Sequence, residues 1–181
     1  MKKILFVAFV LFFLQGCFYL VRYEGTYKGK VIDEATEEPL EGVVILATWY
    51  REYATPAGAI YKYYDARETV TDKNGEFSLS SMGLKVLSNV WPKRITIFKA
   101  GYLYETTSWE IEKEIGRWEG NRVIIPLKKL TTMEERRRNM PSSPPHEAPL
   151  KKVILMLKEI DKARIEIGWD ARKIWRGESY E

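Results

Sequence analysis

The sequence predicts a mainly β protein, a seven-stranded antiparallel sandwich followed by a C-terminal α-helix. Between residues 25 and 130, short runs rich in β-branched and aromatic residues alternate with turn sequences. No long helical period separates these runs, which argues against a parallel α/β sheet. The predicted strands cover residues 27–32, 43–50, 67–71, 76–79, 94–99, 103–110 and 122–127.

Composition limits the kinds of function. The chain has 181 residues, of which 45% are hydrophobic and 30% charged, as in a globular domain with appendages. The formal net charge is +4, and Lys2 and Lys3 supply part of it. No stripe of lysine and arginine with interleaved aromatic residues occurs, so nucleic acid is not an expected partner. One cysteine and one histidine form neither an internal disulfide nor a closed zinc site, and no cofactor is expected.

The first seventeen residues have the pattern of a secretory signal. Lys2 and Lys3 precede eleven uninterrupted apolar residues, 4–14, and then Leu14-Gln15-Gly16-Cys17. This end resembles the lipobox of bacterial lipoproteins, in which signal peptidase II cuts before a cysteine that carries diacylglycerol. The resemblance implies cleavage after residue 16, lipid on Cys17 and attachment to an inner or outer membrane. An uncleaved anchor is the alternative, because residues 4–21 are about long enough to span a bilayer.

Turn sequences separate the strands. Asp72-Lys73-Asn74-Gly75 lies between two predicted strands, and Asn and Gly tolerate positive φ, so a hairpin is expected there. Pro39 cannot donate a ladder hydrogen bond, which places it before or at the edge of a strand.

Four segments in this order resemble the carboxypeptidase regulatory-like domain. They are Gly29-Lys30-Val31-Ile32-Asp33 with Thr36 and Pro39-Leu40-Glu41-Gly42-Val43, the segment 71–79, Ile95-Thr96-Ile97-Phe98-Lys99-Ala100-Gly101-Tyr102, and the segment 123–127. The resemblance implies a transthyretin-like sandwich and a non-catalytic binding or accessory module of secreted and envelope proteins. The segments 51–65 and 80–93 are longer than the usual connections, and loops on a rigid scaffold often carry function.

Catalytic and metal-binding patterns are incomplete. Asp72, Asn74 and Glu76 have the alternation of calcium ligands, but the hairpin explains them equally and no acid follows in residues 79–87. His146 lies in a Pro-rich segment, which holds a general base poorly. Transthyretin-like hydrolases use two histidines and a C-terminal Tyr-Arg-Gly-Ser strand, which Trp175-Arg176-Gly177-Glu178-Ser179 matches only in part. Glu110 and Glu112 could form the pair of carboxylates that glycoside hydrolysis needs. They alternate with Ile111, however, as residues of a solvated strand face do.

Aromatic residues give the clearest functional signal. Six of them lie within sixteen residues: Trp49, Tyr50, Tyr53, Tyr61, Tyr63 and Tyr64. Such side chains either fill a core or contact a partner, since they are large and carry a polar tip. The sequence leaves both interpretations open.

The tail combines a linker and a helix. Thr132 and Glu135 have capping-box spacing before a short polar helix, and four prolines follow in residues 140–149. Apolar residues then recur every three or four positions from Val153 to Ile167, which predicts an amphipathic helix that ends at Gly168. We expect this face to dock on the sandwich, with a partner helix or the membrane surface as the alternative cover.

We therefore expect five segments: a signal peptide (1–16), a lipidated tether (17–24), the regulatory-like sandwich (25–130), a short helix with a Pro-rich linker (131–149) and the amphipathic helix with its tail (150–181). The expected function is a non-catalytic binding or structural module of the envelope, with a protein or envelope polymer as partner. An envelope hydrolase on a transthyretin-like or carbohydrate-active scaffold is the alternative.

Overall fold

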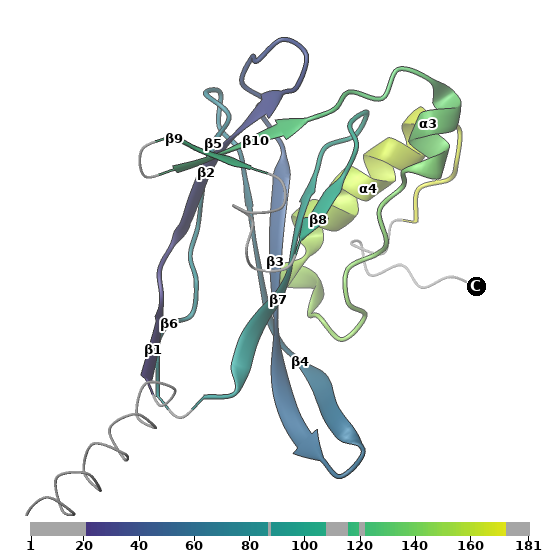
Figure 1. The fold of residues 1–181 in the computed structure, drawn as a ribbon. Helices are drawn as coiled ribbons and strands as arrows, with labels where there is room; N and C mark the ends of the chain where they lie inside the picture. The colour runs from purple at the N-terminus through teal and green to yellow at the C-terminus, as the bar shows by residue number, and fades with distance from the viewer. Residues whose placement is uncertain (1–20, 87, 108–115, 120–121, 173–181) are drawn as a thin grey trace, which may run out of the picture.

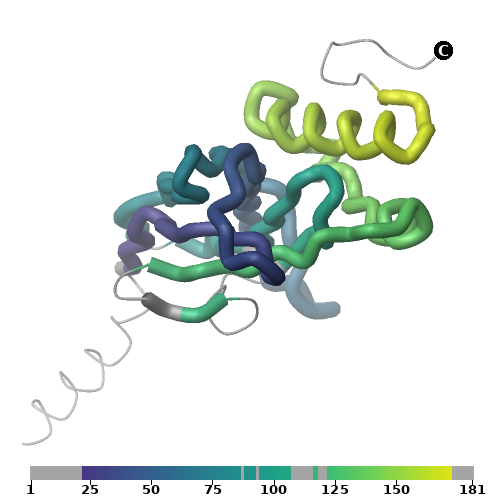
Figure 2. The backbone as a smooth tube through the Cα atoms, turned by 90° about the horizontal axis from the view of Figure 1, so that it is seen from above, coloured from purple at the N-terminus to yellow at the C-terminus, as the bar shows by residue number. Residues whose placement is uncertain are grey.

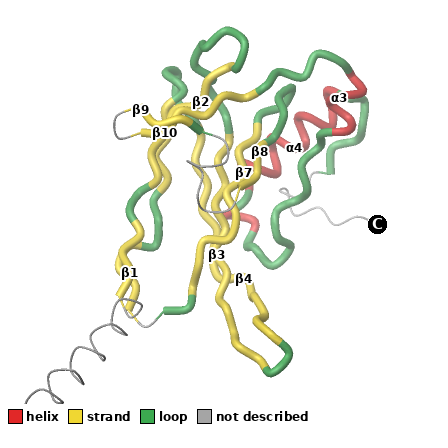
Figure 3. Tube along the Cα trace, viewed as in Figure 1, coloured by secondary structure: helices red, strands yellow, loops and turns green. Residues whose placement is uncertain are grey.

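Two four-stranded sheets and a two-stranded ribbon form the centre of the protein in the computed structural model (Figure 1). The structure describes residues 21–86, 88–107, 116–119 and 122–172. One sheet has the order β5-β2-β10-β9, the other the order β4-β3-β7-β8, and β1 pairs with β6. Figure 3 shows that helices occupy only one side of this assembly.

The elements have the following bounds. The strands are β1 (Val21–Glu24), β2 (Tyr27–Asp33), β3 (Val44–Thr55), β4 (Gly58–Val70), β5 (Glu76–Leu79), β6 (Gly83–Val86), β7 (Val90–Phe98), β8 (Glu105–Thr107), β9 (Arg117–Glu119) and β10 (Arg122–Leu127). The helices are α3 (Met133–Arg138) and α4 (Ile154–Glu166), and a 3₁₀ turn, Leu150–Lys152, precedes α4.

The predicted mainly β composition is confirmed, and each of the seven predicted runs overlaps a strand. Two details of the prediction are wrong. The described residues contain ten strands rather than seven, and β1, β6 and β9 lie in segments that were not predicted to be strands. The pairing is not wholly antiparallel, because β10 lies parallel to β2 with Val123 opposite Gly29. The sequence pattern of a strand indicates which side chains are buried. It does not show whether a partner strand far along the chain runs parallel or antiparallel.

The main core lies between the two sheets. β3 contributes alternate side chains, Ile45, Ala47 and Trp49, and all three are fully buried. Val31 of β2 and Ile125 of β10 belong to the same cluster from the opposite sheet. Alternate residues of a strand point to one face, so this pattern defines the inner face of each sheet.

A second core lies on the other face of β3, beneath α4. Val44 and Leu46 of β3 cluster there with Met156 and Ile160 of the helix. Figure 2 shows α4 lying along one side of the sheets. The structure thus resolves the three alternatives for the amphipathic helix, and its apolar face packs on the sheet of its own chain.

Two carboxylates hold the backbone in this interface. Glu68 of β4 accepts hydrogen bonds from the N–H groups of Leu155 (2.8 Å) and Met156 (3.0 Å). These N–H groups belong to the first turn of α4, where no residue of the helix supplies a side-chain cap. Glu159 of α4 accepts from the N–H of Ala100 (2.8 Å). Glu68 therefore specifies where the helix begins on the sheet.

The other predictions for the tail are confirmed. The Thr132 hydroxyl accepts from the N–H of Glu135, and the Glu135 carboxylate accepts from the N–H of Thr132, each at 3.1 Å. These reciprocal bonds form the predicted capping box. Gly168 ends the last helix with a φ of 78°.

Three segment assignments need correction. The predicted tether, residues 17–24, ends in strand β1, and its last residue, Glu24, is buried. Most of segment 51–65, which we expected to be a loop, extends β3 and β4 into a long hairpin. Residues 80–93 likewise contain β6 and the start of β7.

The hairpin glycine supplies a stability prediction. Gly75 has the expected positive φ (71°), and a Cβ there would lie 2.4 Å from the carbonyl oxygen of Val31. Gly83 has nearly the same φ (69°) but open space around it. We expect Gly83→Ala to lower the free energy of unfolding by about 1–2 kcal/mol through backbone strain alone. Gly75→Ala adds the displacement of a β2 carbonyl and lowers it further. Urea unfolding of both variants measures the difference, and equal losses would contradict it.

Candidate functional site

The β3–β4 hairpin extends beyond the sheet to which it belongs (Figure 1). Pairing of β3 with β7 ends at Arg51 and Val90, whereas pairing of β3 with β4 continues to Thr55 and Gly58. Past Arg51, Glu52 still donates its N–H to the carbonyl oxygen of Asn89 (3.0 Å). In the part of the chain that the structure describes, the residues beyond Glu52 have ladder partners only across the hairpin. We call residues 51–64 the hairpin arm.

A bulge separates the arm from the core. Trp49 pairs with Asp65 and Tyr50 with Tyr63, so Tyr64 has no position opposite it on β3. An extra residue on one strand increases the local twist and re-aims the side chains that follow. The bulge thus marks the point at which the strands leave the packed sheet.

One face of the arm combines exposed rings with cations. Tyr53 and Ile60 are paired across the hairpin and are 39% and 47% exposed. The guanidinium of Arg51 lies 4.8 Å from the ring centre of Tyr64, and the ammonium of Lys62 lies 5.6 Å from that of Tyr53. Both pairs are within the range of cation–π attraction. These contacts hold long side chains against the rings and leave part of each ring open to solvent.

The opposite face begins with a half-buried tyrosine pair. Tyr50 and Tyr63 pack edge to face, with ring centres 6.3 Å apart and planes at 88°. Burial, together with the negative charge of nearby Asp65, raises the pKa of Tyr63 to about 12. Its phenol therefore stays protonated at neutral pH. Tyr61 lies farther along this face, opposite Glu52.

The six aromatic residues thus divide into three groups. Tyr53, Tyr61 and Tyr64 are exposed, and Tyr50 and Tyr63 are half-buried. Trp49 has no exposed surface and belongs to the main core, so its prediction as a partner contact is wrong. Arg51, Ile60 and Lys62 were not among the residues predicted from the sequence. These residues alternate with the tyrosines on both sides of Pro56-Ala57-Gly58, and this alternation could have indicated the hairpin.

Trp49 instead takes part in a buried polar network centred on Glu24. The Glu24 carboxylate accepts hydrogen bonds from the Tyr27 hydroxyl (2.6 Å) and the Trp49 indole N–H (2.9 Å). The Lys85 ammonium lies 2.9 Å from its second oxygen, and both charged side chains are only 8% exposed. This network joins β1 and β6 to the main core.

The environment favours the ionised form of Glu24. Burial alone would raise the pKa of Glu24, but hydrogen bonds from Tyr27, Lys85 and Trp49 outweigh it and hold the pKa below its ordinary value. Burial lowers the pKa of Lys85, and its pairing with Glu24 opposes this only in part. The carboxylate is the better compensated member of the pair.

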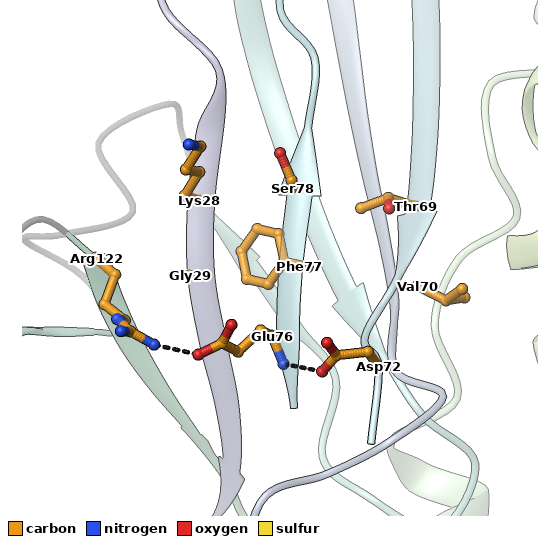
Figure 4. A pocket seen from close by; sticks show the side chains of 9 residues that line it. All are labelled: Lys28, Gly29, Thr69, Val70, Asp72, Glu76, Phe77, Ser78 and Arg122. Atoms are coloured by element: carbon orange, nitrogen blue, oxygen red, sulfur yellow. Dashed lines mark hydrogen bonds and ion pairs between the residues drawn. The ribbon is translucent and has the colours of Figure 1, made fainter. Parts of the chain in front are cut away.

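Two concave features lie elsewhere. A groove of about 590 Å³ is lined by residues of β2, β4, β5 and β10 and by Asp72 (Figure 4). There the Asp72 carboxylate accepts from the N–H groups of Asn74 and Glu76, both at 2.9 Å, and the Glu76 carboxylate pairs with Arg122. These residues, considered as calcium ligands, are thus used by the hairpin turn and an ion pair.

The second cavity, about 280 Å³, lies between the sheet and residues 141–145. Thr48, Thr96 and Thr106 line it with Arg94, so it offers hydroxyl groups and one cation. His146 lies next to this segment, with a side chain that is 92% exposed and 3.5 Å from Glu147. A histidine side chain this exposed is poorly oriented for a general base.

The remaining predicted site residue, Cys17, lies outside the described residues, as do Glu110 and Glu112. Neither helix of the described part of the chain is long and apolar enough to cross a bilayer. No protein-family model matches the chain, and no curated protein or solved structure does so.

The Glu24 network yields a prediction on stability and pH. Ionised Glu24 stabilises the fold above its ordinary pKa of 4.5, and this contribution is lost as the pH falls through the lowered pKa. Glu24→Gln leaves Lys85 buried without its partner, so we expect a loss of about 3–5 kcal/mol at neutral pH. Urea unfolding against pH should show the gap between parent and variant closing in acid.

Glu76→Gln is the matched control, because Glu76 forms an ion pair that is about half exposed on both sides. Exposed pairs contribute about 0–1 kcal/mol. Lys85→Met in the Glu24→Gln background removes the unpaired charge and restores part of the lost stability. Equal effects of Glu24→Gln and Glu76→Gln would show that the buried network does not stabilise the fold.

Proposed function

We propose that this chain is a lipid-anchored protein of the bacterial cell envelope that binds a protein partner through the hairpin arm, without catalysis. The observation that carries the proposal is the arm itself, a projecting hairpin with exposed aromatic residues. The motif Leu14-Gln15-Gly16-Cys17 after an apolar run supports the anchor. On this proposal the lipid localises the molecule and the two sheets hold the arm rigidly.

The chemistry of the arm suits a protein surface. Tyr53, Tyr61 and Tyr64 offer large rings that lose little rotamer entropy when they bind. β4 is the edge strand of its sheet in the described structure, with β3 as its one neighbouring strand. Such an edge can accept an extended strand from another protein through backbone hydrogen bonds. The unpaired backbone edge favours a polypeptide over a polysaccharide.

We also propose that the two sheets form a transthyretin-like sandwich of the carboxypeptidase regulatory-like type. Two of the four resembling segments form adjacent strands, β2 and β10, and a third forms β5 on the other side of β2. The fourth, in β7, lies in the facing sheet and shares the main core. The segments that carry the resemblance thus occur together around one core.

Lipidation is tested on Cys17. A fatty-acid analogue supplied to bacteria that produce the chain should label the parent protein and not Cys17→Ser, because this is the sole cysteine. Gln15→Ala retains Gly16 and Cys17 and should keep the label. Equal labelling of the parent and Cys17→Ser would reject the lipid anchor.

The arm is tested by crosslinking in intact cells. A photoreactive phenylalanine analogue in place of Tyr61 (46% exposed) should give a protein adduct, whereas the same analogue at Ile165 of α4 (62% exposed) should not. Tyr53→Ser with Tyr64→Ser should reduce the adduct by more than about tenfold, since truncating an aromatic anchor commonly costs about 2 kcal/mol or more.

Matched yields at positions 61 and 165, or an adduct that survives the double substitution, would exclude the arm as the partner surface. Circular dichroism of each variant checks that the fold is retained.

A further inference from the structure

The β1–β6 ribbon has its apolar side chains outside and its charged side chains inside. Tyr23 pairs with Leu84, and these residues are 74% and 66% exposed. Val86, two residues from Leu84 on the same strand face, is 57% exposed. The alternate positions hold Glu24 and Lys85, which are buried against the main core.

This arrangement is the reverse of the one that water favours. A strand pair with one solvated face normally turns its polar residues outward. Here two charges bear the cost of desolvation, while three large apolar side chains stay uncovered in the described structure. Covering an aliphatic side chain of this size contributes roughly 1.5–3 kcal/mol. The outer face is therefore suited to an apolar surrounding.

The position of the ribbon in the chain identifies that surrounding. β1 begins at Val21, four residues after Cys17. An extended chain spans at most about 3.3–3.6 Å per residue, so four residues reach no farther than roughly 14 Å. This step rests on the proposed lipid anchor, and an uncleaved apolar segment at residues 4–21 would hold the ribbon equally close. The membrane is thus the apolar phase within reach.

The rim of the ribbon has the chemistry of a membrane interface. The guanidinium of Arg22 lies 4.0 Å from the ring centre of Trp91, which is 38% exposed. Arg22 also donates a hydrogen bond to the carbonyl oxygen of Val90, which fixes its position. Tryptophan, tyrosine and arginine gather at the headgroup level of bilayers, where a ring meets both apolar and polar surroundings.

We infer that the outer face of the β1–β6 ribbon, formed by Tyr23, Leu84 and Val86, inserts into the lipid interface of the membrane to which the chain is anchored. The lipid and the ribbon then form a two-point attachment that sets the orientation of the molecule. Figure 1 shows that the hairpin arm extends toward the same end as the ribbon. The attachment therefore presents the arm close to the membrane surface, where its partner binds.

The experiment places a fluorophore on the ribbon. The full chain with Leu84→Cys is purified from membranes, labelled with an environment-sensitive thiol reagent and reconstituted in phosphatidylethanolamine–phosphatidylglycerol vesicles with acyl-chain-brominated lipid. Interfacial apolar side chains lie about 5–10 Å into the headgroup and acyl boundary, so bromine should quench about half of the emission. Val86→Cys is a second site on the same face and should respond alike.

Ile165→Cys is the matched control, since Ile165 is as exposed as Leu84 (62% against 66%) but lies on α4. Its emission should not change with bromine. Equal quenching at 84 and 165, or none at 84, would overturn the inference. A blue shift at 84 without bromine quenching would mean that protein, not lipid, covers the ribbon, and would overturn it as well.

The same samples separate this inference from the proposed anchor. Parent protein with lipid on its sole cysteine takes up no thiol label, whereas free Cys17 does. If the parent is labelled, lipidation fails, and the ribbon is measured again with Cys17→Ser. Quenching at 84 in that background supports the ribbon without the lipid, and its absence rejects the ribbon.

Discussion

The first half of strand β3 is buried on both faces, and the rest of the structure is built around this constraint. Six consecutive residues, from Val44 to Trp49, have almost no contact with solvent. Alternation sends Ile45, Ala47 and Trp49 into the core between the sheets, and Val44 and Leu46 into the core beneath α4. A strand of this kind needs a cover on each side. The helix is therefore a structural layer of the protein, and Glu68 determines its starting point.

The same strand also explains where the molecule exposes apolar surface. Pairing of β3 with β7 ends at Arg51, and the bulge at Tyr64 of β4 lies next to this point. The ribbon reaches the core through Glu24, whose carboxylate binds Trp49 at the last fully buried position of β3. Arm and ribbon thus both begin where the two-sided packing ends. Their exposed residues, aromatic in the arm and apolar in the ribbon, form the two surfaces to which we assign binding.

Much of this organisation could be predicted from local patterns. The hairpin at Gly75, the capping box at Thr132 and the apolar face of α4 each depend on residues close in sequence. The continuous apolar run at residues 43–47 also signals two-sided burial. The β1–β6 ribbon could not be predicted, because its charged residues are buried and its apolar residues are exposed. A period-two pattern places the charged residues in solvent. The parallel β2–β10 pair and the division of the six aromatic residues depend on contacts between distant segments.

Hydrogen exchange of the β3 amides tests most directly whether α4 and the sheets form one cooperative unit. Met156 of α4 is fully buried against β3, and truncation of such a side chain costs about 2–5 kcal/mol. We predict that Met156→Ala lowers the opening free energy of the amides from Val44 to Thr48 by this amount, together with those of α4, whereas Ile165→Ala changes neither. Faster exchange confined to α4, with β3 protected as in the parent, would show instead that the helix is an independent appendage.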